Sequence, residues 1–298
     1  MKKRIITLLA VLALLVTCSV IAVHAAAGTP ATTGSTIWTE KCPCGCNVTL
    51  GEVDWKIWGT APSTLPSGLT AADYTGSYGA VKVRHVIMNG TPNSQTAITG
   101  ATFGDDTAVK CVIMLGRDGR GTLKNDNVRR NFSITAGSEV WVLGDTASNG
   151  KAPGAIIGVT GTTSSDATKN VQTGGVAYMP ANTKLHLKNV MVLANRSVAS
   201  AKDYGVLASG GLFHVPANSE LTAENCYLRG TYNNTTGGYS NKIVAGAGGL
   251  IYNAGTTTLT DCVLFEGNAV KGIVLSTNAT SGAQTKSSGK GGAIYNTG

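Results

Sequence analysis

The chain contains 298 residues with a formal net charge of +8, and only 13% of its residues are charged. Beyond the first four residues the basic residues do not cluster into a run, which argues against a nucleic-acid-binding protein. Glycine occurs 39 times, and short runs of valine, isoleucine and threonine favour an all-β fold over a helical one.

Residues 1–25 have the pattern of a secretory signal peptide. A basic start, "MKKR", precedes a long apolar run, and Val23 and Ala25 provide small residues for cleavage before Ala26. The alternative is an uncleaved membrane anchor, because the apolar run is nearly long enough to span a bilayer. We expect an exported protein, located outside the cell or on the surface of a bacterium.

Residues 26–80 form a cysteine-rich N-terminal segment and a Pro/Ser/Gly-rich connection. "KCPCGCNV" places Cys42, Cys44 and Cys46 at alternate positions, and three thiolates with one more ligand could hold a zinc ion. However, C-x-C-x-C is not a standard zinc-site spacing. Six cysteines remain after the signal peptide, an even number that suits disulfides in an exported protein. Disulfides or unpaired thiols are therefore the preferred interpretation, and zinc is the alternative.

Trp38, Trp55 and Trp58 lie close to these cysteines in the sequence. Exposed tryptophans could stack on sugar rings, but the open end of a stack of strands also needs a cover. We expect a small Cys- and Trp-containing cap. Beyond it, "VKVRHVIMNG" and "VKCVIMLGRDGRGTL" are interpreted as the first strands of the next domain, residues 81–298.

Internal repeats dominate the second half of the chain. Glycine pairs begin at Gly174, Gly210, Gly248 and Gly291, with spacings of 36, 38 and 43 residues. After each of the first three pairs come a turn and an alternating strand, as in "GGVAYMPANTKLHLKNVMV". "FSITAGSEVWVLGDT", from Phe132, is a more divergent copy. Short strands repeated at this period predict a solenoid, and we interpret it as a parallel β-helix.

The aligned columns of the repeats agree with stacked coils. Glycine pairs permit a positive φ or a close approach between coils, and the column Asn189, Asn225, Asp261 could pass hydrogen bonds from coil to coil. Polar stretches at 196–209, 232–247 and 272–290 are predicted to be loops. Positions expected to face inward along the strands are Val140, Val142, Leu185, Leu187, Leu221, Ala223, Thr257 and Leu259.

"GGLI" and "FEGN" in one repeat, followed by "GGAI" in the next, resemble the paired repeats of chlamydial polymorphic outer-membrane proteins. The chain also resembles "GGAIYN" surface proteins of gut bacteria, which often carry a signal and a "CxCG" segment before the repeats. The resemblance covers roughly residues 130–298 and implies a right-handed parallel β-helix of the pectin-lyase-like type at a cell surface. "GGAIYNTG" begins a coil without completing it, so we expect a C-terminally incomplete β-helix, a fragment of a longer one.

The sequence offers no catalytic residues that we can name. The candidate carboxylates are Asp203, Glu220, Glu224, Asp261 and Glu266, of which only Glu224 and Asp261 fall on or beside aligned strands. His85, His186 and His214 are each isolated in the sequence. We expect a non-catalytic protein that is adhesin-like or contacts host or cell-wall glycans or surface proteins. The alternatives are a polysaccharide lyase or glycoside hydrolase of the same fold, and a structural stalk.

Two further cysteines, Cys226 and Cys262, align in neighbouring repeats. Stacked inward positions lie near the lower end of the Cα separations that a disulfide tolerates. Reduced thiols packing as small apolar groups are the favoured alternative.

Overall fold

The structure is a computed structural model, which describes residues 36–65, 68–75, 85–87, 101–104, 110–115, 122–124, 132–144, 154–158, 162–163, 174–194, 205–207, 209–234, 239–267, 269, 271–277, 281 and 284–298. The predicted signal peptide, residues 1–25, lies outside these residues. In the described part, helical structure is limited to three 3-10 turns, η1 (Ile37–Thr39), η2 (Leu50–Glu52) and η3 (Ala71–Asp73). No described helix has the length and hydropathy needed to cross a membrane. The protein is therefore all-β in its described part.

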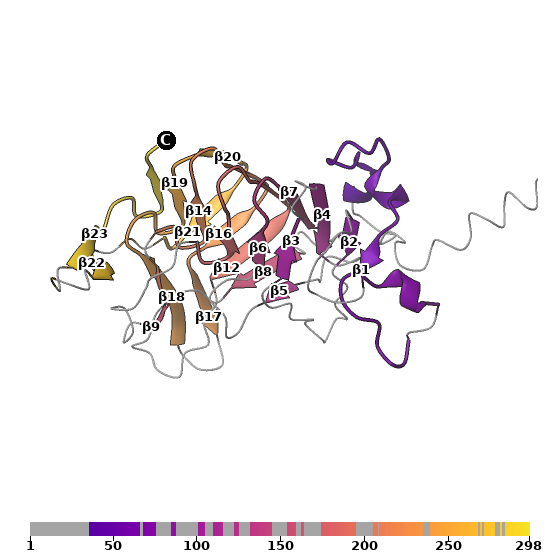
Figure 1. The fold of residues 1–298 in the computed structure, drawn as a ribbon, viewed down its shortest axis with the longest axis horizontal. Helices are drawn as coiled ribbons and strands as arrows, with labels where there is room; N and C mark the ends of the chain where they lie inside the picture. Colours follow the sequence, from indigo (N-terminus) through magenta and orange to yellow (C-terminus); the bar gives the residue numbers. More distant parts are fainter. Residues whose placement is uncertain are drawn as a thin grey trace, which may run out of the picture.

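Three stacked parallel sheets form the body of the molecule (Figure 1). Sheet 1 has the order β1 (Lys56–Ile57), β2 (His85–Ile87), β4 (Lys110–Leu115), β7 (Glu139–Gly144), β11 (Lys184–Lys188), β15 (Glu220–Glu224), β20 (Thr256–Thr260). Sheet 2 has the order β3 (Ala101–Phe103), β6 (Phe132–Ile134), β10 (Ala177–Tyr178), β14 (Phe213–Val215), β19 (Ile251–Asn253), β24 (Ile294–Asn296). Sheet 3 has the order β5 (Thr122–Lys124), β8 (Gly154–Gly158), β12 (Val190–Ala194), β16 (Tyr227–Arg229), β21 (Val263–Phe265).

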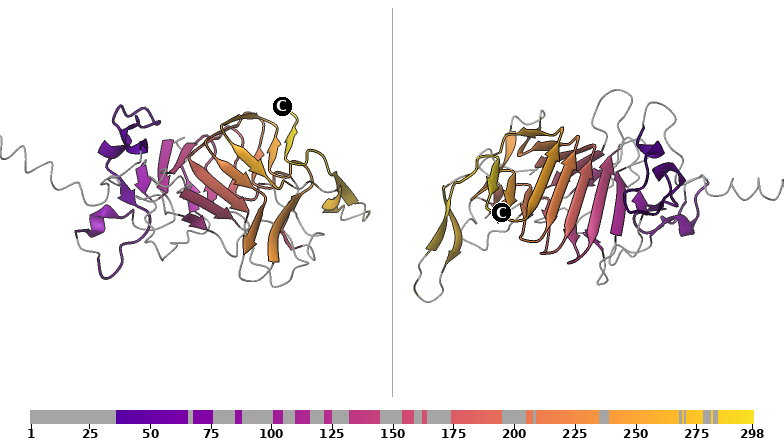
Figure 2. Two further views of the ribbon diagram at one scale, coloured as in Figure 1. Left: turned by 180° about the vertical axis from the view of Figure 1, so that it is seen from behind. Right: turned by 90° about the horizontal axis from the view of Figure 1, so that it is seen from above.

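The chain visits these sheets in a fixed rotation. Each of β3–β4–β5, β6–β7–β8, β10–β11–β12, β14–β15–β16 and β19–β20–β21 places one strand in sheet 2, then one in sheet 1, then one in sheet 3. All pairings within the three sheets are parallel. The right-hand view of Figure 2 shows successive strands side by side along the long axis.

The strand registers reproduce the repeat lengths of the sequence. In sheet 2, Ala177 pairs with Phe213, Phe213 with Ile251 and Ile251 with Ile294, which are offsets of 36, 38 and 43 positions. In sheet 1, Glu220 pairs with Thr256, an offset of 36. The third repeat is thus two residues shorter in the turn between these sheets, and the aligned strands themselves keep their length.

A continuous apolar core fills the space between the sheets. The predicted inward positions of β7, β11 and β15 are all buried, because alternate side chains of a strand point to one face of its sheet. In β20, which is the last strand of sheet 1, Thr257 and Leu259 are only partly buried. Three phenylalanines lie fully buried in this core, Phe103, Phe132 and Phe213.

The turns use the residues that the repeat alignment singled out. The first glycine of each pair has a positive φ, for example +65° at Gly210, where an added Cβ would meet the backbone of Phe213. Asn189, Asn225 and Asp261 also have positive φ, and the Asn225 Nδ2 donates to Asn189 Oδ1 over 2.9 Å. The glycine prediction is confirmed, and the predicted hydrogen bond from coil to coil is confirmed between Asn225 and Asn189.

The polar stretches between repeats are not simply loops, so that prediction is wrong. Part of 196–209 forms β13 (Gly205–Leu207), which lies in a four-stranded sheet with β9 (Thr162–Thr163), β17 (Thr231–Asn234) and β18 (Tyr239–Ala245). Most of 272–290 belongs to an antiparallel hairpin of β22 (Lys271–Thr277) and β23 (Gln284–Ser288). Both features project from the body (Figure 1). Their sequences are polar overall but contain valine, isoleucine, threonine and tyrosine, which favour strands.

The N-terminal segment covers the outer face of sheet 1 as well as its first edge. β1 pairs with β2 at that edge, whereas Ile37, Trp38, Leu50 and Trp55 form a second apolar cluster with outward-facing side chains of β2, β4 and β7. We call residues 36–58 the cap. Its three tryptophans are buried with at most 4% exposure, which leaves them unsuited to stacking on sugars.

Candidate metal centre

The three N-terminal cysteines lie in a small closed loop. Lys41 forms an antiparallel bridge with Thr49, and the Cys42 N–H donates to the Val48 carbonyl over 2.9 Å. Within the loop, Gly45 and Asn47 adopt positive φ values of 85° and 63°. These left-handed residues turn the backbone sharply, so the three thiols converge on one point instead of being spread along one face of an extended strand.

The fourth member of the cluster comes from sheet 1. His85 begins β2, and its Nε2 lies 3.3 Å from the Sγ atoms of both Cys42 and Cys44 and 4.0 Å from that of Cys46. The ligand atoms of all four residues lie within 4.8 Å of one another. These four side chains could therefore hold one metal ion.

The spacing suits a tetrahedral site. A zinc ion with Zn–S bonds of about 2.3 Å separates its sulfur ligands by roughly 3.8 Å, and Cys3His is an established structural ligand set. The Cys42 and Cys44 sulfurs are 3.1 Å apart, so they need to separate by less than about 1 Å to reach that spacing. The same distance is far longer than the ~2.05 Å of a disulfide.

The protein environment acts differently on the thiols of this cluster. Burial raises the pKa of Cys42, and so does the hydrogen bond that its thiol donates to the Cys44 sulfur. Partial burial opposes ionisation of Cys46, but hydrogen bonds from the Val48 backbone and from the neighbouring thiols outweigh it and lower the pKa of Cys46. A bound cation would favour the thiolate at every position, since only the deprotonated sulfur is a ligand.

Aromatic packing orients the histidine. The ring of Trp55 lies edge-to-face with that of His85, with centroids 5.6 Å apart. Trp55 is itself fixed by its indole N–H, which donates to the Leu50 carbonyl over 2.8 Å, and by contact with Trp38. The cysteine–histidine cluster and the apolar cluster of the cap are thus one connected unit.

The cysteines are free thiols in the structure. The disulfide part of the preferred interpretation is therefore not what the structure contains, while the metal-binding alternative gains the ligand that it lacked. His85 was described from the sequence as isolated, and in three dimensions that description is wrong. A single histidine at the start of a short apolar strand, 39 positions after Cys46, carried no local signal that could have found it.

Cys226 and Cys262 form the reduced ladder that was favoured. Cys226 is buried, and burial raises its pKa to about 12. The Cys262 Sγ donates to the Ala223 carbonyl over 3.3 Å. Both residues fill small spaces beside sheet 3, and neither contributes to the metal centre.

The other candidate residues do not assemble into a carboxylate cluster in the described part of the chain. Glu224 pairs with Lys188 at 3.1 Å, Glu220 with Lys184 at 3.5 Å, and Glu266 with Arg229 at 2.9 Å. Asp261 occupies its left-handed turn. Asp203 lies outside the described residues.

Comparison of the chain with protein-family models, with curated proteins and with solved structures found no match.

Proposed function

We propose that the protein is an exported, surface-associated β-helix whose N-terminal cap is fastened to the first coils by a zinc ion. The observation that carries the zinc assignment is the convergence of three thiols of the cap with His85 of sheet 1. Zinc is the natural occupant, because thiolate and imidazole ligands in a tetrahedral set select it over magnesium or calcium. Its role here is structural, since all four coordination positions are taken by protein side chains.

The fold assignment goes beyond an all-β architecture. We infer a right-handed parallel β-helix of the pectin-lyase-like type. Support comes from the fixed rotation of the chain through three parallel sheets, from the register offsets that equal the repeat lengths, and from the resemblance of the "GGAI" repeats.

The biological role that fits best is adhesion or glycan contact without catalysis. The signal-peptide pattern of residues 1–25 supports export, and the resemblance to repeat-containing surface proteins supports display outside the cell. The strands β17, β18, β22 and β23 project from the coils (Figure 2), so they offer surface for a partner beyond the stacked sheets.

Two measurements test this function. Metal analysis of the purified chain should find one zinc ion per molecule, and stoichiometry near zero after purification without chelators would remove the zinc proposal. A screen of the zinc-loaded protein against glycan arrays, mucin and host cells should find retained ligands. Failure to bind any of them would remove the adhesin and glycan proposal and favour a structural stalk.

A further inference from the structure

A cavity of about 270 Å³ lies between the cap and the outer face of sheet 1. One wall belongs to the cap segment that carries the cysteines, and it consists of Glu40, Lys41, Pro43 and Leu50. The floor belongs to strands β7, β11, β15 and β20. Two parts of the chain that are more than 90 positions apart therefore build the cavity together.

The floor consists of two registered rows of outward-facing side chains. The first row runs Trp141, His186, Thr222, Thr258 across β7, β11, β15 and β20. The second row runs Leu143, Lys188, Glu224, Thr260 across the same strands. In both rows an apolar side chain lies beneath the edge of the cap and a hydroxyl ends the row, so the floor changes from apolar to polar along its length.

Charges in the cavity are balanced and fixed. The Lys188 Nζ lies 2.9 Å from a Glu40 carboxylate oxygen of the cap and 3.1 Å from one of Glu224. With Lys41, which also lines the cavity, two lysines stand against two carboxylates, so the cavity has no excess positive charge that would select an anion. The carboxylates keep further acceptor positions, because an ionised carboxylate offers about four lone-pair sites.

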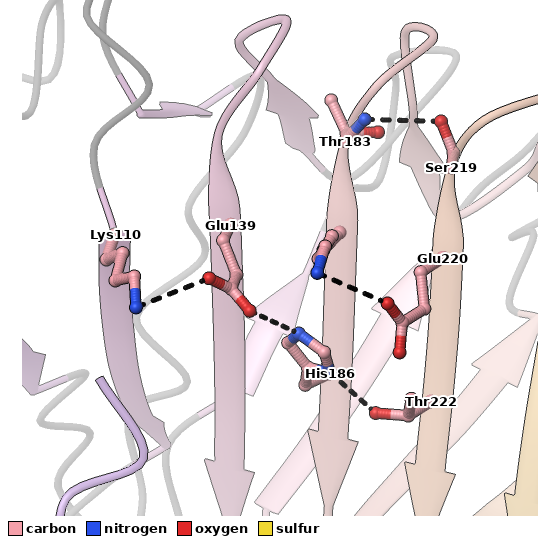
Figure 3. A network of polar contacts seen from close by, with 8 residues as sticks. Lys110, Glu139, Thr183, His186, Ser219, Glu220 and Thr222 are labelled. Atoms are coloured by element: carbon pink, nitrogen blue, oxygen red, sulfur yellow. Dashed lines mark hydrogen bonds and ion pairs between the residues drawn. The ribbon is translucent and has the colours of Figure 1, made fainter. Parts of the chain in front are cut away.

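A second polar network holds the first row in place (Figure 3). The His186 ring lies 2.7 Å from Thr222 Oγ1 through Nδ1 and 3.1 Å from Glu139 Oε1 through Nε2. It also stacks on the Trp141 indole, with centroids 5.1 Å apart and an interplanar angle of 19°. These three contacts fix the position of the imidazole. Its contact with Thr222 in turn fixes the orientation of the Thr222 hydroxyl at the cavity.

We propose that this cavity binds one neutral sugar ring of a glycan, and that metal binding at the cysteine–histidine cluster stabilises the cavity in its binding shape. A pyranose offers several hydroxyl donors and acceptors, which match the carboxylates of Glu40 and Glu224 and the threonine hydroxyls of the floor. Trp141 and Leu143 are buried, so they add only a small apolar surface. The volume lies just below the ~300 Å³ at which pockets for larger ligands begin, so it suits one ring better than an extended chain. Further sugars of the same glycan would continue over the exposed Thr258 and Thr260.

The shape of the cavity depends on the metal ion because the wall residues are covalently connected to the cysteine ligands. Glu40, Lys41 and Pro43 immediately precede or interleave with Cys42 and Cys44, and His85 ties those cysteines to sheet 1. Without the ion, the wall is held to the floor by the Lys188–Glu40 contact and the apolar cluster of the cap. Metal binding therefore pre-organises the cavity, which reduces the ordering cost of ligand binding. The inference rests on the proposed glycan contact and names its site.

The test compares binding of methyl glycosides to the full-length, zinc-loaded chain by saturation-transfer NMR and calorimetry. Neutral hexosides and N-acetylhexosaminides form one arm, and a methyl glucuronoside forms the anionic arm. Glu224→Gln should weaken binding of the neutral sugar about tenfold, the loss expected for one charge-assisted hydrogen bond. Glu220→Gln is the matched control, because Glu220 lies on the same strand and pairs with Lys184 outside the cavity; it should change affinity less than about twofold.

The metal arm uses the wild-type chain treated with a chelator and then reloaded with zinc. Circular dichroism verifies that the sheets persist, so loss of binding is not loss of the fold. Binding that weakens on chelation and recovers with zinc supports the inference. Equal binding by the chelated protein, equal binding by Glu224→Gln, or tighter binding of the glucuronoside would each overturn it. If glycan arrays retain the protein but no neutral monosaccharide occupies the cavity, this site is wrong while the proposed function stands.

Discussion

The Nε2 atom of His85 lies 3.3 Å from the Sγ atom of Cys42, although 43 positions separate the two residues. This contact joins the cap to the second strand of sheet 1. It makes one ligand set from a loop with no standard zinc spacing and a histidine with no neighbouring ligand in the sequence.

Removal of one thiol should abolish stoichiometric metal binding. Cys44→Ser leaves a weak hydroxyl ligand where a thiolate would coordinate, so the variant should lose the thiolate-to-metal absorption of the cobalt-substituted protein. Cys262→Ser is the matched control, because Cys262 is also a half-buried free thiol but lies outside the cluster. Identical cobalt spectra for the two variants would contradict the Cys3His assignment.

His85→Ala should weaken metal affinity by more than the roughly 10–100-fold that follows loss of an outer-shell partner. The imidazole is a direct ligand in the proposed site, and alanine provides no replacement. Competition with a chromophoric chelator measures the affinity. An unchanged affinity would show that the three cysteines bind metal without sheet 1.

Metal removal should loosen the cap and leave the central coils intact. Backbone amides near the centre, such as that of Cys42 bonded to Val48, are expected to exchange hydrogen faster in the chelated protein. Amides of β11 and β15, which lie between other strands of sheet 1, should keep their protection. Hydrogen exchange read by mass spectrometry distinguishes this pattern from uniform loss of protection, which would mean that the metal stabilises the whole domain.

Gly210→Ala should destabilise the protein by at least about 2 kcal/mol. Alanine disfavours the left-handed backbone conformation of this position, and its Cβ would also clash with a neighbouring residue. Gly210 has φ +65°, and the new Cβ would meet the Phe213 backbone of its own turn. Gly292→Ala serves as the control, since a Cβ there meets nothing within 4 Å. Chemical unfolding compares the two, and equal midpoints would show that the turn can relax.

Lys188, which lines the cavity, should make the stability of the protein depend on pH in the alkaline range. Burial opposes the charge of Lys188, but hydrogen bonds to Glu40 and Glu224 outweigh it, so the pKa is raised above its ordinary value of 10.5. A raised folded-state pKa gives stability that is fully present below the unfolded pKa and is lost as pH rises through the folded pKa. The wild type should therefore be more stable than Lys188→Met below about pH 10, and the difference should shrink as the pH rises above the ordinary pKa. A difference in unfolding free energy that stays constant over this range would contradict a charged role for Lys188.

Much of the stacked architecture could be predicted from local patterns. Leu185 and Leu187 alternate with Lys184, His186 and Lys188, and the structure buries the leucines while leaving the others partly exposed. The sequences of β4 and β7 are continuous apolar runs, which predict strands that are buried on both faces. Cys111, Ile113 and Leu115 face the main core, whereas Val112 and Met114 face the cap, and strands buried on both faces lack alternation.

The predictions for the polar stretches failed for a related reason. Segments such as 272–290 were interpreted as loops because they are polar and vary in length, yet β22 and β23 pair with each other outside the repeat. Their hydrogen bonds are antiparallel and local, so they need no periodic spacing and leave no trace in the repeat alignment.

By itself, the sequence determined the β-rich character, the inward face of the repeat strands and the register between coils. These features follow from a two-residue side-chain period and from repeat lengths that must equal the strand offsets of stacked coils. Only the tertiary structure decided that His85 joins the three cysteines and that the cap lies over the outer face of sheet 1. Those contacts connect segments with no shared period, and they form because the cap and the outer face of β2, β4 and β7 bury each other's apolar side chains.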